Sequence, residues 1–224
     1  MIELIENDDR LIGSQAAIEA LSKKENARII VLSDSHGNTE IFRNIILRYG
    51  SGCDALIFCG DGLSDLARIL EETESSEELK EAMPPVIAYV QGNCDISAYV
   101  LMPGKSPEGR PPVSQVLWAA GKGIYISHGH YESVNFTREP LAMRASAEEC
   151  QVAVYGHTHI PDSSVDEKYA TRIFNPGSCC RPRGGFPPSF LILTLMPDVI
   201  DAAFIRISDP FCQQPDFQVF SPMF

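Results

Sequence analysis

The stretch RIIVLSDSHGN at residues 28–38 joins a short apolar run to a polar loop rich in potential metal ligands. Its first half consists mainly of isoleucine, valine and leucine, which is typical of a buried β-strand. Its second half places the carboxylate of Asp34 and the imidazole of His36 directly after that strand. Asn38 can then cap a helix that ends at Gly50. Because ligands collect at the carboxyl ends of strands in α/β sheets, this stretch predicts a strand, a site and a helix in that order.

The same arrangement recurs four more times along the chain. Further apolar runs at 55–59, 86–90, 124–127 and 152–155 predict strands, and each is followed by a polar cluster. These clusters are Gly60-Asp61-Gly62, Gly92-Asn93-Cys94-Asp95, His128-Gly129-His130 and Gly156-His157-Thr158-His159. All five histidines of the chain lie within the five clusters. Neutral imidazole and carboxylate groups suit manganese, iron, zinc, cobalt or nickel, so the pattern predicts one convergent metal site.

The rest of the chain predicts an α/β fold with a parallel or mixed sheet. Helices are expected at 63–70 and 138–149, and a closing hairpin at 190–195 and 199–207. Segments rich in proline and glycine predict loops at 103–112, 161–168 and 181–188. Residues 1–27 are expected to form an N-terminal appendage, with a short strand at 2–5. A helix within 8–25 either covers a sheet edge or mediates dimerisation.

Composition narrows the class of protein. The 224 residues include 44% hydrophobic residues and carry a formal net charge of −12, which disfavours binding to large nucleic acids or anionic membranes. Seven cysteines without a C-x-x-C pair argue against a disulfide framework and against a cysteine-rich zinc site. No apolar run approaches the roughly 18 residues of a membrane helix. We therefore expect a cytoplasmic globular protein.

The ordered motifs carry a family resemblance. The series Asp34-x-His36, Gly60-Asp61-x-x-x-Asp65, Gly92-Asn93-x-Asp95, His128-Gly129-His130 and Gly156-His157-x-His159 resembles the calcineurin-like metallophosphoesterase superfamily. It is most similar to the small bacterial and archaeal branch of YfcE-type phosphodiesterases, which Asn175-Pro176-Gly177-Ser178 also resembles. The resemblance covers about residues 28–207. Two departures are that Asp65 falls one residue late and that Cys94 stands where the wider pattern has a histidine.

This resemblance implies a fold and a ligand set. The fold is a four-layer αββα sandwich with two mixed β-sheets, formed by residues 28–224. Two divalent ions are implied, with manganese expected and nickel, cobalt, iron or zinc left open. Asp61 would bridge them, and His130 would be left free near the substrate. One ion would take Asp34, His36 and His159; the other would take Asn93, His128 and His157.

The net charge of the implied metal site agrees with the activity that the resemblance implies. Two divalent ions less the two aspartates Asp34 and Asp61 leave about +2 at the site, which lets an acidic chain bind a phosphate. The resemblance implies a dinuclear phosphodiesterase that hydrolyses small phosphodiesters by attack of a metal-activated water. Alternatives are a phosphomonoesterase or nuclease of the same superfamily. A further alternative is a non-catalytic metal-binding scaffold that acts through protein partners, as the retromer scaffold subunit does. We expect a small phosphoester as substrate, no large nucleic acid and no membrane as partners; a homo-oligomer remains open.

Four features outside the implied ligand set keep two interpretations each. Cys94 either replaces a proton-donating histidine, which would restrict the enzyme to good leaving groups, or only fills a small pocket. Arg181, together with Arg183, either contacts the substrate phosphate or lies on the surface. Asp65 and Asp95 either orient ligands or cap helices.

Overall fold

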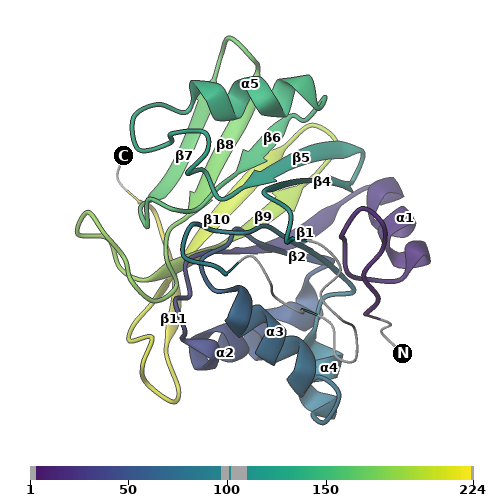
Figure 1. The fold of residues 1–224 in the computed structure, drawn as a ribbon, viewed down its shortest axis with the longest axis vertical. Helices are drawn as coiled ribbons and strands as arrows, with labels where there is room; N and C mark the ends of the chain where they lie inside the picture. Colours follow the sequence, from purple (N-terminus) through teal and green to yellow (C-terminus); the bar gives the residue numbers. More distant parts are fainter. Residues whose placement is uncertain (1–3, 97–100, 102–109, 223–224) are drawn as a thin grey trace.

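Two stacked β-sheets form the centre of the molecule in a computed structural model that describes residues 4–96, 101 and 110–222 (Figure 1). The first sheet has the strand order β11-β10-β9-β1-β2-β3. Strands β1 to β3 are parallel, whereas β9, β10 and β11 are antiparallel to their neighbours. Its strands are β1 (Ala27–Leu32), β2 (Ala55–Phe58), β3 (Val86–Tyr89), β9 (Ser189–Leu195), β10 (Ile200–Ile207) and β11 (Phe217–Phe220).

The second sheet has the order β4-β5-β6-β8-β7. Its three inner strands are parallel, and its two edge strands are antiparallel to them. Both sheets are therefore mixed. The strands are β4 (Ser114–Ala119), β5 (Lys122–Ser127), β6 (Val152–Val154), β7 (Pro161–Asp166) and β8 (Thr171–Pro176).

Helices cover the outer face of each sheet, which completes the predicted four-layer αββα sandwich. Alternate residues of β1 show the layering, because Ile30 and Leu32 pack with the helices while Ile29 and Val31 pack between the sheets. The first sheet is covered by α2 (Thr39–Tyr49), α3 (Leu63–Glu72) and α4 (Glu77–Ala82), and the second by α5 (Glu139–Ala147). Within the described residues, no helix is both long and apolar enough to cross a membrane.

The local signals around α2 are confirmed. The side-chain oxygen of Asn38 accepts a hydrogen bond from the backbone N–H of Ile41 at 3.1 Å, and Gly50 ends the helix before the short 3₁₀ turn η1 (Gly50–Gly52). An N-cap of this kind stabilises a helix by about 1 kcal/mol. The cap fixes where the helix starts, and so it also fixes the loop that carries Asp34 and His36.

The N-terminal segment covers the edges of both sheets beside β3 and β4 (Figure 1). Ile12 forms a β-bridge with Ile87 of β3, and the carbonyl of Leu21 in α1 (Gln15–Lys23) accepts a hydrogen bond from Ala120. Leu21 is buried in the core between the sheets. Covering a sheet edge is thus the role observed for this helix. Part of the expected strand at 2–5 lies outside the described residues, and Leu4 and Ile5 are not in a strand.

The loop predicted at 161–168 is wrong, because residues 161–166 form edge strand β7 paired with β8. A proline is tolerated at the first residue of an edge strand, where its missing N–H costs no ladder bond. Strands β4, β8 and β11 were also not predicted from the sequence. The loop at 181–188 is confirmed, whereas most of the expected loop at 103–112 lies outside the described residues.

Candidate metal centre

Five loops from both sheets carry the candidate ligands to one edge of the sandwich. They follow β1, β2 and β3 of the first sheet and β5 and β6 of the second, each at the carboxyl end of its strand. All seven candidate ligands from the sequence lie in these loops, and the structure brings them together in two adjoining groups. Convergence of parallel strand ends from two sheets explains how residues more than a hundred positions apart meet.

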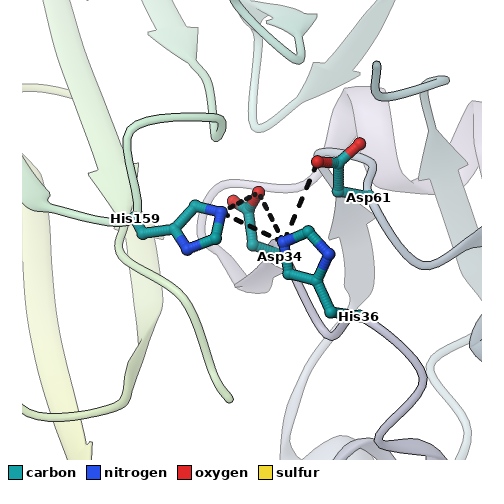
Figure 2. Close-up of side chains that lie close together, drawn as sticks. All are labelled: Asp34, His36, Asp61 and His159. Atoms are coloured by element: carbon teal, nitrogen blue, oxygen red, sulfur yellow. Dashed lines mark hydrogen bonds and ion pairs between the residues drawn. The ribbon is translucent and has the colours of Figure 1, made fainter. Parts of the chain in front are cut away.

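The first ligand group consists of Asp34, His36, Asp61 and His159 (Figure 2). One potential ligand atom from each of them lies within 4.8 Å of the other three. The Nε2 atoms of His36 and His159 are 3.0 Å apart, and His159 Nε2 is 3.1 Å from Asp34 Oδ1. Asp34, Asp61 and His159 are buried, and His36 is half-buried.

The protonation pattern of this group fits a cation. The Nδ1 atom of His159 donates a hydrogen bond to the carbonyl oxygen of Arg181, and in that tautomer Nε2 presents a lone pair. That lone pair faces Asp34 Oδ1, a buried oxygen that accepts no hydrogen bond within the described residues. Acceptors that face one another in a buried site need a positive charge between them. A divalent ion would supply it.

The second ligand group consists of Asn93, His128 and His157, next to the shared Asp61. Asn93 Oδ1 lies 3.1 Å from His128 Nε2 and 2.7 Å from His157 Nδ1. The Nδ1 atom of His128 bonds to the carbonyl oxygen of Cys59 at 2.6 Å, which leaves its Nε2 atom facing the group. Burial lowers the pKa of His157, as it does for His36, and so favours the neutral imidazole that a metal ion requires.

Asp61 lies between the two groups. Its Oδ2 atom is 3.8 Å from His36 Nε2 and 3.5 Å from His128 Nε2, while its Oδ1 atom accepts a hydrogen bond from the backbone N–H of Cys94 at 2.7 Å. Burial would raise the pKa of the Asp61 carboxyl, but hydrogen bonds from His128 and Cys94 outweigh it and hold that pKa well below the usual range. Burial would lower the pKa of His128, and Asp61 reverses this. A proton on His128 Nε2 would therefore occupy a position where a metal ion could bind.

The ligand loops hold an unusual backbone conformation. Asp34, His36, Asp61, His157 and His159 all have positive φ angles, between 46° and 68°. Residues other than glycine seldom adopt this left-handed region, and they do so mainly where function requires it. This conformation turns the five side chains out of the strand direction and toward one another.

Two glycines make the close approach of these loops possible. A Cβ atom on Gly92 would lie 2.1 Å from Asp61 Oδ1, and one on Gly156 would lie 1.9 Å from Ser33 Oγ and 2.8 Å from Asp34 Oδ2. Both contacts are far shorter than van der Waals distance. The glycines predicted from the sequence therefore allow the backbone to pass directly behind the two carboxylates.

Asp95 fulfils both roles that the sequence left open, whereas Asp65 only positions a ligand loop. The Asp95 carboxylate accepts hydrogen bonds from the backbone N–H groups of Asp61, Gly62, Leu63 and Gly92, so it caps α3 and fixes the Asp61 loop. The Asp65 carboxylate accepts hydrogen bonds from the hydroxyls of Ser35 and Thr39 and from the N–H of Gly37. It thereby ties α3 to the loop that carries His36.

Three further candidates lie around the two groups. The His130 ring is 5.4 Å from that of His128, centroid to centroid, and burial lowers its pKa. Cys94 is exposed, and desolvation followed by the Asp61 charge raises its pKa to about 11, so the thiol stays protonated. The Arg181 guanidinium reaches the carbonyl oxygen of His36 at 3.5 Å, on the side of the first group.

Sequence reasoning missed the groups that orient the imidazoles. Asn135 Nδ2 lies 2.9 Å from His157 Nε2, and the carbonyl oxygens of Cys59 and Arg181 receive the Nδ1 protons of His128 and His159. A main-chain carbonyl leaves no trace in residue type, so no sequence signal could have found the latter two. Asn135 lies outside the five sequence clusters, five residues beyond His130.

The comparisons with known proteins agree with this geometry. Residues 28–198 match the model of the calcineurin-like phosphoesterase superfamily domain. The chain is 32% identical to a probable metallophosphoesterase, YsnB of Bacillus subtilis, over 81% of this chain and 90% of that protein. It is 31% identical to the phosphodiesterase YfcE of Escherichia coli, over 74% and 86%.

Solved structures show the same fold. The structure of E. coli YfcE, described as a phosphoesterase, superposes with a TM-score of 0.52 and 22% identity over 87% of this chain and all of that one. Vacuolar Protein Sorting 29 of Cryptosporidium parvum superposes with a TM-score of 0.62 and 16% identity over 88% and 98%. With its ordered motifs, convergent ligands and matching family model, this chain belongs to the calcineurin-like phosphoesterase superfamily.

Proposed function

We propose that this protein is a two-metal-ion phosphodiesterase that hydrolyses small phosphodiesters. The observation that carries the proposal is Asp61, a buried carboxylate that lies between two groups of imidazole, carboxylate and amide side chains. Asp34, His36 and His159 would hold one ion with Asp61, and Asn93, His128 and His157 would hold the other. Manganese suits this mixture of imidazole and carboxylate, as do iron, cobalt, nickel and zinc.

When bound, such ions supply Lewis-acid chemistry: they polarise phosphoryl oxygens and lower the pKa of water. The residues of the chain prepare the site for that chemistry. The Cys94 amide fixes one oxygen of Asp61 so that the other faces both groups. Main-chain carbonyls hold the rings of His128 and His159 in one tautomer. His130 lies beside the second group, where a lowered pKa leaves it neutral and able to contact the ester oxygen of a substrate.

Cys94 is not a nucleophile in this proposal. With a pKa of about 11 its thiol is protonated at neutral pH, and a protonated thiol is a poor attacking group. A thiol is also a weak proton donor to a departing alkoxide. We therefore retain the expectation that esters with good leaving groups are preferred, with His130 as the nearest alternative donor.

A metal-resolved activity screen tests the proposal. The apo-protein is loaded with manganese, nickel, cobalt, zinc or magnesium, and hydrolysis of bis-(p-nitrophenyl) phosphate is compared with that of p-nitrophenyl phosphate. We expect strict metal dependence and faster turnover of the diester. A protein that binds two ions yet hydrolyses neither ester would contradict the proposal.

A binding scaffold is the second candidate, because the likeness to Vacuolar Protein Sorting 29 extends over most of both chains. The complete donor set favours catalysis over this alternative, since a pure scaffold has no need for five strained ligands. Metal loading without hydrolysis in the screen above would favour the scaffold.

A further inference from the structure

The loop at 129–136 exposes aromatic rings beside the second ligand group. Tyr131 is 61% exposed and Phe136 is 88% exposed. Large apolar side chains scattered singly over a surface need no explanation, but these two lie in one short loop that contacts the second ligand group through His130 and Asn135. The loop is anchored by buried Glu132, whose carboxylate accepts a hydrogen bond from Ser127 at 2.7 Å. The rings are therefore presented on a fixed support.

Direct contacts connect this loop to the candidate ligands. The Tyr131 ring stacks on His130 with a centroid distance of 4.0 Å, and the His130 ring lies 5.4 Å from that of His128. Phe136 follows Asn135, whose side chain lies 2.9 Å from His157 Nε2. Tyr131 thus lies two ring contacts outward from a metal ligand. An aromatic group attached directly to a phosphate would meet His130 first, whereas a base separated from the phosphate by a sugar would reach Tyr131.

The opposite side of the centre has a different chemistry. There the group next to the ligands is the guanidinium of Arg181, 3.5 Å from the carbonyl oxygen of His36. The two ester groups of a bound phosphodiester would accordingly meet unlike surroundings, one cationic and one aromatic.

We propose that Tyr131 forms a subsite for a nucleobase, so that the substrates of this enzyme are small esters of nucleoside phosphates. This inference rests on the proposed function, because the phosphate must lie over the two ions for the base to reach the loop. Stacking of a base on an aromatic side chain contributes about 1–3 kcal/mol, which corresponds to about tenfold or more in affinity.

Competitive inhibition by product-like monoesters tests the subsite without depending on which ester bond breaks. The manganese-loaded enzyme is inhibited with adenosine 5′-monophosphate and with methyl riboside 5-phosphate, which differ only in the base. We expect about tenfold tighter inhibition by the nucleotide. Tyr131→Phe should keep this preference, and Tyr131→Leu should reduce it to about twofold or less.

Controls separate the subsite from the metal centre. Trp118→Leu removes an aromatic ring that is 43% exposed on β4, a strand that supplies no ligand, and should keep the full preference. Elemental analysis of every variant checks that the number of bound ions is unchanged. Inhibition by phenyl phosphate, an aromatic ester without a sugar, is compared with inhibition by methyl phosphate.

The outcomes are distinct. Equal inhibition by nucleotide and abasic phosphate in an enzyme that binds metal and hydrolyses diesters overturns the subsite alone and leaves the loop as a surface for a protein. A Tyr131-dependent gain for phenyl phosphate but none for the nucleotide also overturns it. Failure to bind metal or to hydrolyse any diester overturns the proposed function itself.

Discussion

The two ligand groups share Asp61 but differ in burial and charge. The first group places buried Asp34 and His159 beside half-buried His36, with a second carboxylate from Asp61. The second group has only the shared carboxylate, a neutral amide from exposed Asn93, the buried imidazole of His128 and the half-buried imidazole of His157. More negative charge and less water favour tighter binding of a cation. The comparison teaches that the two groups offer a cation unequal surroundings: the first presents two carboxylates, and the second presents one.

Removing Asp61, which the two groups share, should have the largest effect on metal binding. We expect Asp61→Ala to lose both ions and to lower kcat/KM for a p-nitrophenyl diester more than about 10³-fold, because several kcal/mol of Lewis-acid stabilisation disappear. Elemental analysis of protein reconstituted with manganese gives the stoichiometry. Asp201→Ala is the control, because Asp201 is an exposed residue of β10, and this variant should keep two ions. One ion retained in Asp61→Ala would contradict a shared ligand.

Removing one histidine from each group sharpens the comparison. His157→Ala should keep one tightly bound ion, whereas His159→Ala should weaken the tighter site. Either variant should lose about 10²-fold in activity, since the remaining ion still polarises the phosphate. Titration calorimetry with manganese resolves the two affinities. Equal losses of both ions in His157→Ala would show that the groups do not bind independently.

Beside the second group, Cys94 stands where the wider family pattern has a histidine. Cys94→His introduces an imidazole next to Asn93, and general-acid help is typically worth about 10²–10⁴-fold. We expect a gain toward the lower end of that range on alkyl phosphodiesters, with little change on p-nitrophenyl esters. The comparison of the two leaving groups is made at full metal loading. If the dependence on leaving group stays the same, the proton comes from elsewhere, with His130 as the nearest ring.

The smallest of these effects concerns the orientation of one imidazole. Asn135→Ala removes the side chain that lies against His157 Nε2, and we expect about 10- to 100-fold weaker binding of the second ion with the first unchanged. The affinity of the first site serves as an internal control in the same titration. Asn135→Gln or Asn135→Asp should restore part of the loss. A uniform weakening of both sites would mean that the substitution only loosens the loop.

The sequence predicted most of the elements that carry ligands, because each is a strand buried on both faces. The runs 29–32 and 55–59 are apolar throughout, so both faces of each strand are expected to be buried. Strand β7 was missed because its surface position gives it the composition of a loop, Pro161-Asp162-Ser163-Ser164. Its strand character comes from pairing with β8, which is tertiary information.

The candidate site was predictable as a set of residue types, but not as a geometry. The confinement of all five histidines to strand ends indicated convergence. It did not indicate which nitrogen of each ring faces the centre. For His128 and His159 that choice is made by main-chain carbonyls of Cys59 and Arg181, which any residue could supply. The roles of Asp65 and Asp95 likewise emerged only from their backbone partners.

The left-handed backbone at five candidate ligands has a consequence for how such a protein responds to selection. Each such residue costs about 1–2 kcal/mol relative to an unstrained conformation, and glycine at the same position avoids that cost. Substituting Gly for His36, for example, should raise the melting temperature of the metal-free protein even as it weakens ion binding. Selection for thermal stability alone would therefore replace these five residues before it changed residues of the sheets.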